Sequence, residues 1–287
     1  MIWLAFVSGA VLGIAAFVLV TGLLRMRRRP SSPVISIIPA LVVFFLLIGF
    51  PDGSACLALA STRVYLVGGQ SRASGVVPSS ELTDSEAVIP ANVEYWSNVT
   101  GLPGQHQLLS SYRDLPKFGP EVKLIKLLAN HYPGQRIIVI KVAKGGTNMG
   151  HWISGGTMHT LFFETVQAIL ANEDPYFCNL FWSQGEQDMV TEIREELYES
   201  RTISFFADAR AEFRADLIIN MVLADAPVED YPYQYGVANG QQRIAKNDPF
   251  TRAVTSQGLS KYPDGVHDDK AGTMELGRRM YVTAMGN

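Results

Sequence analysis

The chain has 287 residues, long for one domain, and 47% of them are hydrophobic, so it can bury a sizeable core without covalent staples. Its first fifty residues hold four Arg and no acidic residue, which leaves 20 basic and 27 acidic residues beyond them and a net charge near −7. This balance excludes nucleic acid as an expected partner. With only two cysteines, Cys56 and Cys178, a disulfide framework is excluded as well.

Residues 1–24 form an uncharged apolar run that is long enough, at about 1.5 Å per residue, to cross a hydrocarbon core of about 30 Å. A basic cluster at residues 25–29 follows this run instead of preceding it, which favours an uncleaved anchor over a signal peptide. A second apolar run at residues 34–50 is shorter and contains Pro39. Taken alone, it indicates a full span, a re-entrant segment or an internal signal.

We therefore expect residues 1–52 to be a membrane anchor of one or two transmembrane helices, with membrane lipid as a partner. If both apolar runs cross, they form a hairpin whose basic loop at residues 25–29 faces the cytoplasm or the matrix under the positive-inside bias. The remainder of the chain, expected to fold as one domain over residues 61–287, then lies on the opposite side of the membrane.

The first predicted strand of this domain, residues 64–67, is a short apolar run that ends at a Gly-Gly turn. Ser71 follows in the sequence Gly-Gln-Ser-Arg. A serine on a strand-to-helix turn projects its hydroxyl into the crevice and holds its own amide near a helix N-terminus, where developing negative charge is favoured. By itself such a block is more often a plain turn.

Residues 72–120 show little periodicity and many Pro, Ser and Gly, so we expect a long irregular excursion that could roof the site. A helix is predicted at residues 121–131 and a strand at residues 136–143. The turn after this strand, Lys144 to Thr147, contains two glycines and is suited to presenting an amide donor to the crevice.

The next predicted helix, residues 158–172, precedes a strand at residues 177–182. The block Trp-Ser-Gln-Gly-Glu-Gln-Asp at residues 182–188 ends this strand. Its position and its carboxamides again suit an oxyanion hole, which needs donors aimed at one point.

A helix at residues 193–214, a strand at residues 217–224 and a weaker strand at residues 253–259 complete the alternating pattern before a last helix at residues 272–285. Asp264 and His267 stand just before that helix. A serine hydroxyl needs a base, and the base needs an acid to fix its tautomer, so an Asp and a His three residues apart can supply both. The same spacing also occurs by chance in solvated loops.

Strands that alternate with helices predict an α/β fold with right-handed crossovers and a parallel sheet covered on both faces. Ligands of such sheets bind beyond the carboxyl ends of the strands. Each of the blocks described above follows a predicted strand, as a ligand site requires.

The ordered set of blocks from about Arg63 to the C-terminus resembles the SGNH hydrolases, and specifically their sialate O-acetylesterase-like branch, carbohydrate esterase family six. This resemblance implies a flavodoxin-like, three-layer SGNH fold. It also implies a serine esterase that removes acetyl or other short acyl groups, with an O-acetylated carbohydrate or another small ester as substrate.

The resemblance assigns roles to particular residues. Ser71 corresponds to the nucleophile, His267 to the base and Asp264 to the acid that orients the base. The oxyanion hole would be lined by the amides of Ser71 and Gly146 and by the side chain of Gln184. The residues expected to support the site are Gln70, Arg72 and Glu186.

Two positions depart from the family pattern. Arg72 replaces the Asn that follows the serine, and Ser183 stands where the family commonly has His or another aromatic residue. Neither change removes a member of the triad. They motivate an alternative in which the domain is a catalytically weakened, esterase-fold accessory subunit with partner subunits in a membrane complex.

The sequence predicts neither a metal nor a cofactor. His151, His159, Glu164 and the pair Asp268-Asp269 lack a recognised metal-ligand spacing, so roles in loops and on helix surfaces are expected for them.

Overall fold

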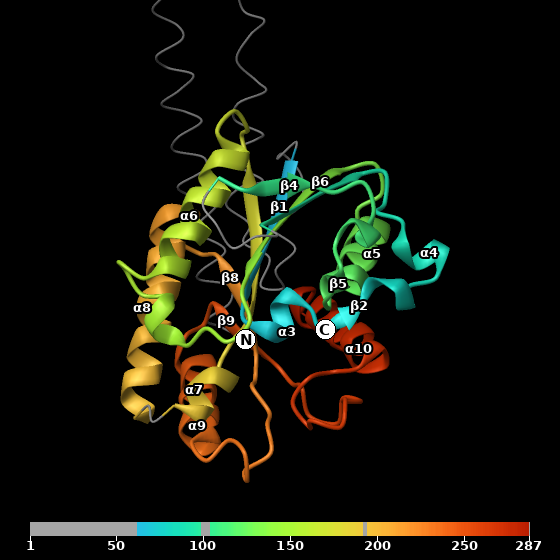
Figure 1. The fold of residues 1–287 in the computed structure, drawn as a ribbon. Coiled ribbons are helices and arrows are strands. Elements are labelled where there is room, and N and C mark those ends of the chain that lie inside the picture. Colours follow the sequence, from blue (N-terminus) through green and yellow to red (C-terminus); the bar gives the residue numbers. More distant parts are fainter. Residues whose placement is uncertain (1–61, 99–103, 192–193, 287) are drawn as a thin grey trace, which may run out of the picture. The chain divides into compact units, whose positions relative to one another are not determined.

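The computed structural model describes residues 62–98, 104–191 and 194–286. Their centre is a seven-stranded sheet with the strand order β4-β3-β6-β1-β7-β8-β9 (Figure 1), in which neighbouring strands run parallel except for the antiparallel pair β3 and β4. The strands are β1 (Thr62–Gly69), β3 (Val93–Asn98), β4 (His106–Leu108), β6 (Arg136–Ala143), β7 (Tyr176–Ser183), β8 (Ile218–Val222) and β9 (Thr251–Val254). Two short strands, β2 (Val77–Pro78) and β5 (Lys117–Phe118), form a separate antiparallel pair.

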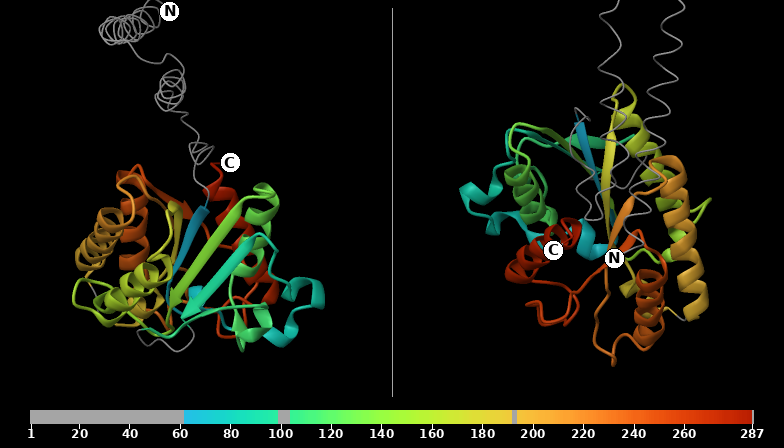
Figure 2. Two further views of the ribbon diagram at one scale, coloured as in Figure 1. Left: turned by 90° about the horizontal axis from the view of Figure 1, so that it is seen from above. Right: turned by 180° about the vertical axis from the view of Figure 1, so that it is seen from behind.

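Helices cover both faces of the sheet. Helices α6, α8 and α9 lie on one side and α5 and α10 on the other (Figures 1 and 2). The helices are α3 (Ser71–Ser74), α4 (Asp84–Ala87), α5 (Glu121–His131), α6 (Thr157–Leu170), α7 (Glu186–Val190), α8 (Glu195–Glu212), α9 (Gln234–Asn247) and α10 (Lys270–Ala284). Three short 3-10 turns are at Ser79–Glu81, Tyr112–Asp114 and Met149–His151.

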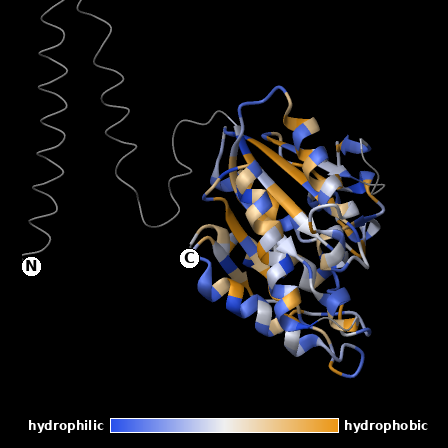
Figure 3. Cartoon of the chain, turned by 90° about the vertical axis from the view of Figure 1, so that its left-hand side faces the viewer, coloured by the Kyte–Doolittle hydropathy of each residue, from blue (hydrophilic) through white to orange (hydrophobic). Residues whose placement is uncertain are grey.

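The central strand β1 shows why the sheet is buried on both faces. Successive side chains of a strand point to opposite faces, so Val64 and Leu66 enter the core under α6 and α8 while Tyr65 and Val67 enter the core under α5 and α10. A strand buried on both sides is a continuous apolar run, as this one is. Figure 3 shows the hydrophobic strands enclosed by helices. The result is an α/β fold of three layers.

The strand order places the ligand site. Without β3 and β4, the order β6-β1-β7-β8-β9 is the 2-1-3-4-5 arrangement of flavodoxin-like sheets. The connections reverse direction beside β1, and crevices form at such switch points beyond the carboxyl ends of the strands. The segments after β1, β6 and β7 meet there.

Some expectations about elements were wrong. Residues 72–120 are not one irregular excursion, because Val93–Asn98 forms β3, which pairs in parallel with β6. The helix α9 was not predicted, and the last strand, Thr251–Val254, comes earlier than the predicted residues 253–259. The predicted membrane hairpin at residues 1–52 lies outside the described residues. Within the described residues, each helix is too short or too polar to cross a bilayer.

Candidate active site

Ser71 is the first residue of α3, immediately past the carboxyl end of β1. The Gln70 amide donates to the Ser183 carbonyl at 2.8 Å, and the Lys144 amide donates to the Gly69 carbonyl at 3.0 Å, so the turn is fastened to β7 and β6. Gly69 has φ +133°, and a Cβ there would lie 1.9 Å from the Ser183 carbonyl oxygen. Only glycine fits this position, which sets the direction in which Ser71 points.

On the loop before α10, His267 comes within hydrogen-bond distance of Ser71, and Asp264 within hydrogen-bond distance of His267. His267 Nε2 lies 3.1 Å from Ser71 Oγ, and His267 Nδ1 lies 2.8 Å from Asp264 Oδ2. Asp264 Oδ1 accepts hydrogen bonds from the amides of Val266 and His267, both at 2.9 Å. This is the arrangement that a nucleophile, a base and an orienting acid would need.

The Asp264 carboxylate is held ionised. Burial works to raise its pKa, but hydrogen bonds from the imidazole and amide of His267 and from the Val266 amide outweigh burial, and the net pKa is lowered. An ionised acid favours the tautomer with the proton on Nδ1, which leaves Nε2 free to accept a proton from Ser71. The His267 side chain is 31% exposed, so a ligand can reach it.

The turn that contains Gly145 and Gly146 approaches Ser71 at Gly145. A Cβ on Gly145 would stand 3.5 Å from the Ser71 Cβ, and Gly146 adopts φ +72°. The first feature brings bare backbone close to Ser71, as an oxyanion hole built from amides requires. Gly145, which the sequence did not single out, is thus the glycine of this turn that contacts Ser71, and the Gly146 amide stays a predicted oxyanion donor.

The side chain of Gln184 is directed elsewhere. It is fully buried, donates to the Thr147 carbonyl at 3.2 Å and contacts the Asp188 carboxylate. Both N–H groups of its carboxamide are thus engaged, and its place in the oxyanion hole stays a prediction that would need an exchange of partners. The half-buried Gln187 has its Oε1 3.9 Å from the Cβ position of Gly146. It is the second carboxamide of the same block.

Asp188 is the last residue of this block, and it is fully buried. Its carboxylate accepts the Met149 amide at 3.0 and 3.2 Å, and so supports the chain that follows the Gly145–Gly146 turn. Burial raises the pKa of Asp188 to about 6, although the hydrogen bonds from Gln184 and Met149 oppose the rise. Asp188 therefore affects the site indirectly, through its contacts with Met149 and Gln184.

The predicted supporting residues contact one another. The Gln70 carboxamide donates to Glu186 Oε2 at 2.5 Å and accepts the Gln187 amide at 3.2 Å. Arg72 Nη1 lies 3.1 Å from Glu186 Oε1. Because Glu186 begins α7, these bonds join the nucleophile turn to the segment that follows β7.

Asp268 lies in a loop, one of the two places expected for it, but it is buried there. Asp268 is 2% exposed, and its Oδ2 lies 2.9 Å from Arg72 Nε. Its neighbour Asp269 accepts the Gly272 amide as the N-cap of α10. Nothing in the local sequence separates these two aspartates, because only the tertiary fold brings Arg72 to one of them.

Metal ligation finds no support in the described part of the chain: no three His, Cys, Asp or Glu side chains gather there as a ligand set. His159, one of the histidines set aside from the sequence, pairs instead with Asp208 at 3.0 Å.

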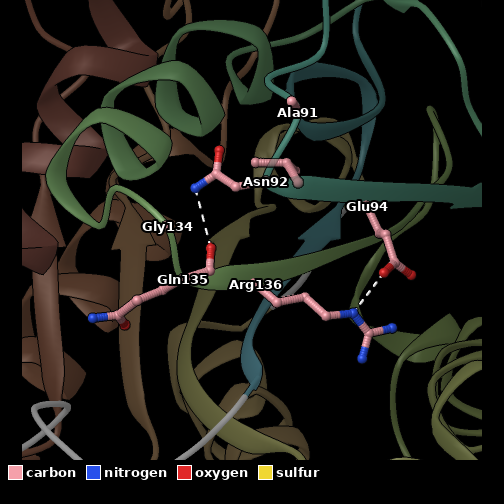
Figure 4. Close-up of a pocket in the computed structure, with 7 residues that line it drawn as sticks. Ala91, Asn92, Glu94, Gly134, Gln135 and Arg136 are labelled. Atoms are coloured by element: carbon pink, nitrogen blue, oxygen red, sulfur yellow. Dashed lines mark hydrogen bonds and ion pairs between the residues drawn. The ribbon is translucent and has the colours of Figure 1, made fainter.

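Two cavities accompany this sheet. One, of about 300 Å³, lies beside the amino ends of β3 and β6, where Asn92 donates to the Gln135 carbonyl at 3.1 Å and Arg136 contacts Glu94 at 2.6 Å (Figure 4). It is at the wrong end of the strands for a ligand site of this fold. The other, of about 200 Å³, is at the carboxyl ends of the same strands. It is lined by Ser74, Gly75, Ser97, Asn98, Leu115, Pro116, Lys117, Lys141 and Ala143.

The family model of carbohydrate esterases described as sialic acid-specific acetylesterases matches residues 61–286. The chain belongs to this family. It is therefore a carboxylic ester hydrolase of the carbohydrate acetylesterase kind, and the family resemblance predicted from the sequence blocks is confirmed. A search of curated proteins gave no match to this esterase.

Solved structures share the fold of this esterase. A protein from Arabidopsis thaliana has a TM-score of 0.65 at 16% identity, over 78% of this chain and 98% of that chain. A carbohydrate acetylesterase from Xanthomonas citri has a TM-score of 0.60 at 16% identity, over 78% of this chain and 57% of that one. NanS has a TM-score of 0.60 at 13% identity, over 80% and 98%. At these identities the likeness shows the SGNH-like α/β fold.

Proposed function

We propose that this protein is a membrane-anchored serine esterase that removes acetyl or another short acyl group from a carbohydrate oxygen. Its nucleophile is Ser71, its base His267 and its orienting acid Asp264. The observation that carries the proposal is the continuous chain of hydrogen bonds from Ser71 Oγ through the imidazole to the Asp264 carboxylate, with contacts of 3.1 and 2.8 Å.

In the proposed reaction, His267 Nε2 takes the proton of Ser71 as Oγ attacks the acyl carbon. The carbonyl oxygen becomes an oxyanion that the amides of Ser71 and Gly146 stabilise. The tetrahedral species collapses, the imidazolium returns its proton to the sugar oxygen, and the alcohol leaves. Water then attacks the acyl-serine by the same route and releases the carboxylic acid, with no metal or cofactor in either step.

The departure at Arg72 is compatible with this chemistry. Its side chain is 4% exposed and turns to Glu186 and Asp268, so it neither occupies the crevice nor competes for the serine hydroxyl. Ser183 contributes its carbonyl to the Gln70 amide. These contacts favour an enzyme over the alternative of a catalytically weakened accessory subunit.

The membrane part of the proposal rests on the sequence of residues 1–52, which carries two apolar runs around a basic cluster. The basic loop at residues 25–29 would face the cytoplasm or matrix, and the esterase domain, residues 61–287, the opposite side. The substrate would then be met at or near a lipid surface.

Hydrolysis of a small acetyl ester and of an O-acetylated sugar by the full-length protein in mild detergent tests the activity. Ser71→Ala should lower kcat/KM by about 10³-fold or more, because the acyl-enzyme route is lost. Ser200→Ala is the matched control, since that exposed hydroxyl bonds only to the Leu197 carbonyl of its own helix among the contacts described. Equal rates for wild type and Ser71→Ala would refute the proposal.

A further inference from the structure

Arg72 follows the nucleophile directly and makes three buried contacts with distant parts of the chain. Its Nη1 lies 3.1 Å from Glu186 Oε1, its Nε lies 2.9 Å from Asp268 Oδ2, and its Nη2 donates to the Val266 carbonyl at 3.0 Å. The three partners lie on α7 and on the loop before α10. A single side chain on α3 therefore joins α3 to α7 and to the loop before α10.

The burial of this group shows that it is a built feature. The Arg72 side chain is 4% exposed, and those of Glu186 and Asp268 are 5% and 2% exposed. Removing three charges from water is unfavourable unless each finds partners of good geometry. Two of the contacts are ion pairs within 3.1 Å, and the bond from Nη2 to the Val266 carbonyl is the one of the three with hydrogen-bond geometry.

The partners of Arg72 stand on both sides of the catalytic base. Val266 and Asp268 are the residues immediately before and after His267, and Arg72 is the residue immediately after Ser71. We propose that Arg72 is a positioning residue, which clamps both flanks of His267 to the helix that carries Ser71 and so fixes the separation of base and nucleophile. This inference rests on the proposed function, because it assigns Arg72 a task in the same reaction.

Arg72 also affects the protonation of the buried Asp268 carboxyl. Burial raises the pKa of the Asp268 carboxyl, and Arg72 is the strongest of the charges that oppose this rise. The other charged or titratable groups that act on Asp268 are Lys261, Glu186 and His267. Without Arg72, a buried carboxyl beside the imidazole would lose its main partner and would favour its protonated form.

The first test measures catalysis by full-length Arg72→Met and Arg72→Lys. A base displaced by about 1 Å costs about 10²-fold in rate, so Arg72→Met should lower kcat by about that factor while KM stays within about threefold. Arg72→Lys, which keeps the charge but not the planar fork, should fall between Arg72→Met and wild type. The control is Arg210→Met, which removes an arginine paired with Asp248 at 2.8 Å on another part of the domain.

A catalytic loss of that size in Arg72→Met, with Arg210→Met close to wild type, supports the clamp. A kcat for Arg72→Met as high as that of Arg210→Met overturns it. A loss that appears only in KM overturns it too, because that result would place Arg72 in substrate binding.

The second test does not depend on activity. Arg72→Met should lower the melting temperature by about 10 °C, because two buried carboxylates lose their cation. Combining it with Asp268→Asn should lower it by less than the sum of the two single changes. Since the remaining Asp268 carboxyl must ionise in the fold as pH rises, the destabilisation in Arg72→Met should be larger at pH 8 than at pH 5.

The two tests separate the two claims. If melting temperatures are additive and the effect of Arg72→Met is independent of pH, the clamp is absent even if the protein hydrolyses esters. If hydrolysis does not depend on Ser71, the proposed function fails and the catalytic role of Arg72 fails with it, while the coupling between Arg72 and Asp268 is still measured.

Discussion

At the scale of single residues, Ser71, the proposed nucleophile, is placed by a neighbour that has no side chain. Gly69 combines φ +133° with a carbonyl oxygen of Ser183 that would lie 1.9 Å from any Cβ. The cost of a side chain there is steric as well as conformational, so the turn has to move if the residue changes. Such a movement is transmitted to Ser71, two residues later.

Gly69→Ala should therefore lower the free energy of unfolding by at least about 2 kcal/mol and reduce esterase activity by at least about 10²-fold, because the turn shifts Ser71 away from His267. Gly134→Ala is the matched control, since Gly134 also has a positive φ, +76°, but open space around its Cβ position. It should cost about 1 kcal/mol and leave activity intact. Denaturant unfolding and ester hydrolysis measure both effects, and equal losses in the two variants would contradict this account of Gly69.

At the scale of elements, a second buried ion pair supports the helix that carries Ser71. Lys141 Nζ on β6 lies 2.8 Å from Glu121 Oε1 at the start of α5, and it also donates to the Ser74 carbonyl of α3 at 3.0 Å. The side chains of the pair are 4% and 0% exposed. Glu121 Oε1 further accepts Tyr95 Oη and the Gly119 amide, both at 3.1 Å.

Lys141→Met should cost about 3–5 kcal/mol in the free energy of unfolding, because it leaves the Glu121 carboxylate buried without its cation. Lys141→Met combined with Glu121→Gln should cost less than the sum of the single changes. In contrast, Lys270→Met removes a lysine whose pair with Glu86 is about one-third exposed, and it should cost at most about 1 kcal/mol. Similar losses of unfolding free energy in Lys141→Met and Lys270→Met, measured by denaturant unfolding, would show that the buried pair stabilises the fold no more than the exposed pair does.

The elements that the sequence predicts well are those whose local pattern agrees with their tertiary surroundings. The strand Arg136–Ala143 and the helix Glu121–His131 match the prediction at both ends, because each is a strongly patterned run with clear polar or Gly borders. The strand Val93–Asn98 was missed because Glu, Ser and Asn interrupt its apolar residues. Its pairing with β6 is a long-range contact. The helix Gln234–Asn247 contains two glycines and few apolar residues, so its burial against α8 outweighs its weak propensity.

The candidate site was predictable to the extent that its residues form recognisable blocks. Ser71, Asp264 and His267 stand in such blocks, and the structure brings them together across 196 residues of sequence. The partners of Arg72 were not predictable, because Asp268 differs from Asp269 only in the direction it faces after the chain folds. The burial of Gln184 was missed for a similar reason, since its partners Thr147 and Asp188 are brought to it by the packing of the turn after β6 and helix α7.

At the scale of the whole molecule, the proposal joins an esterase domain to an anchor of residues 1–52. If the anchor spans a bilayer, the full-length protein should remain in the membrane pellet after extraction at alkaline pH and should be released only by detergent. Fractionation of cells that express the full chain measures this. Release into the supernatant at alkaline pH would mean that the apolar runs do not span the membrane.

In the proposed mechanism the esterase domain depends on one reacting atom, Ser71 Oγ. The imidazole that activates it, that of His267, comes from the other end of the domain's sequence. The activation of this hydroxyl is tested most directly by mass spectrometry of the full-length protein after exposure to a fluorophosphonate probe, which reacts with activated serine hydroxyls. One covalent adduct is expected on the peptide that contains Ser71, absent in Ser71→Ala and formed about 10³-fold more slowly in His267→Ala. An unmodified Ser71 in the folded protein, or labelling that is equally fast without the His267 imidazole, would contradict the proposed mechanism.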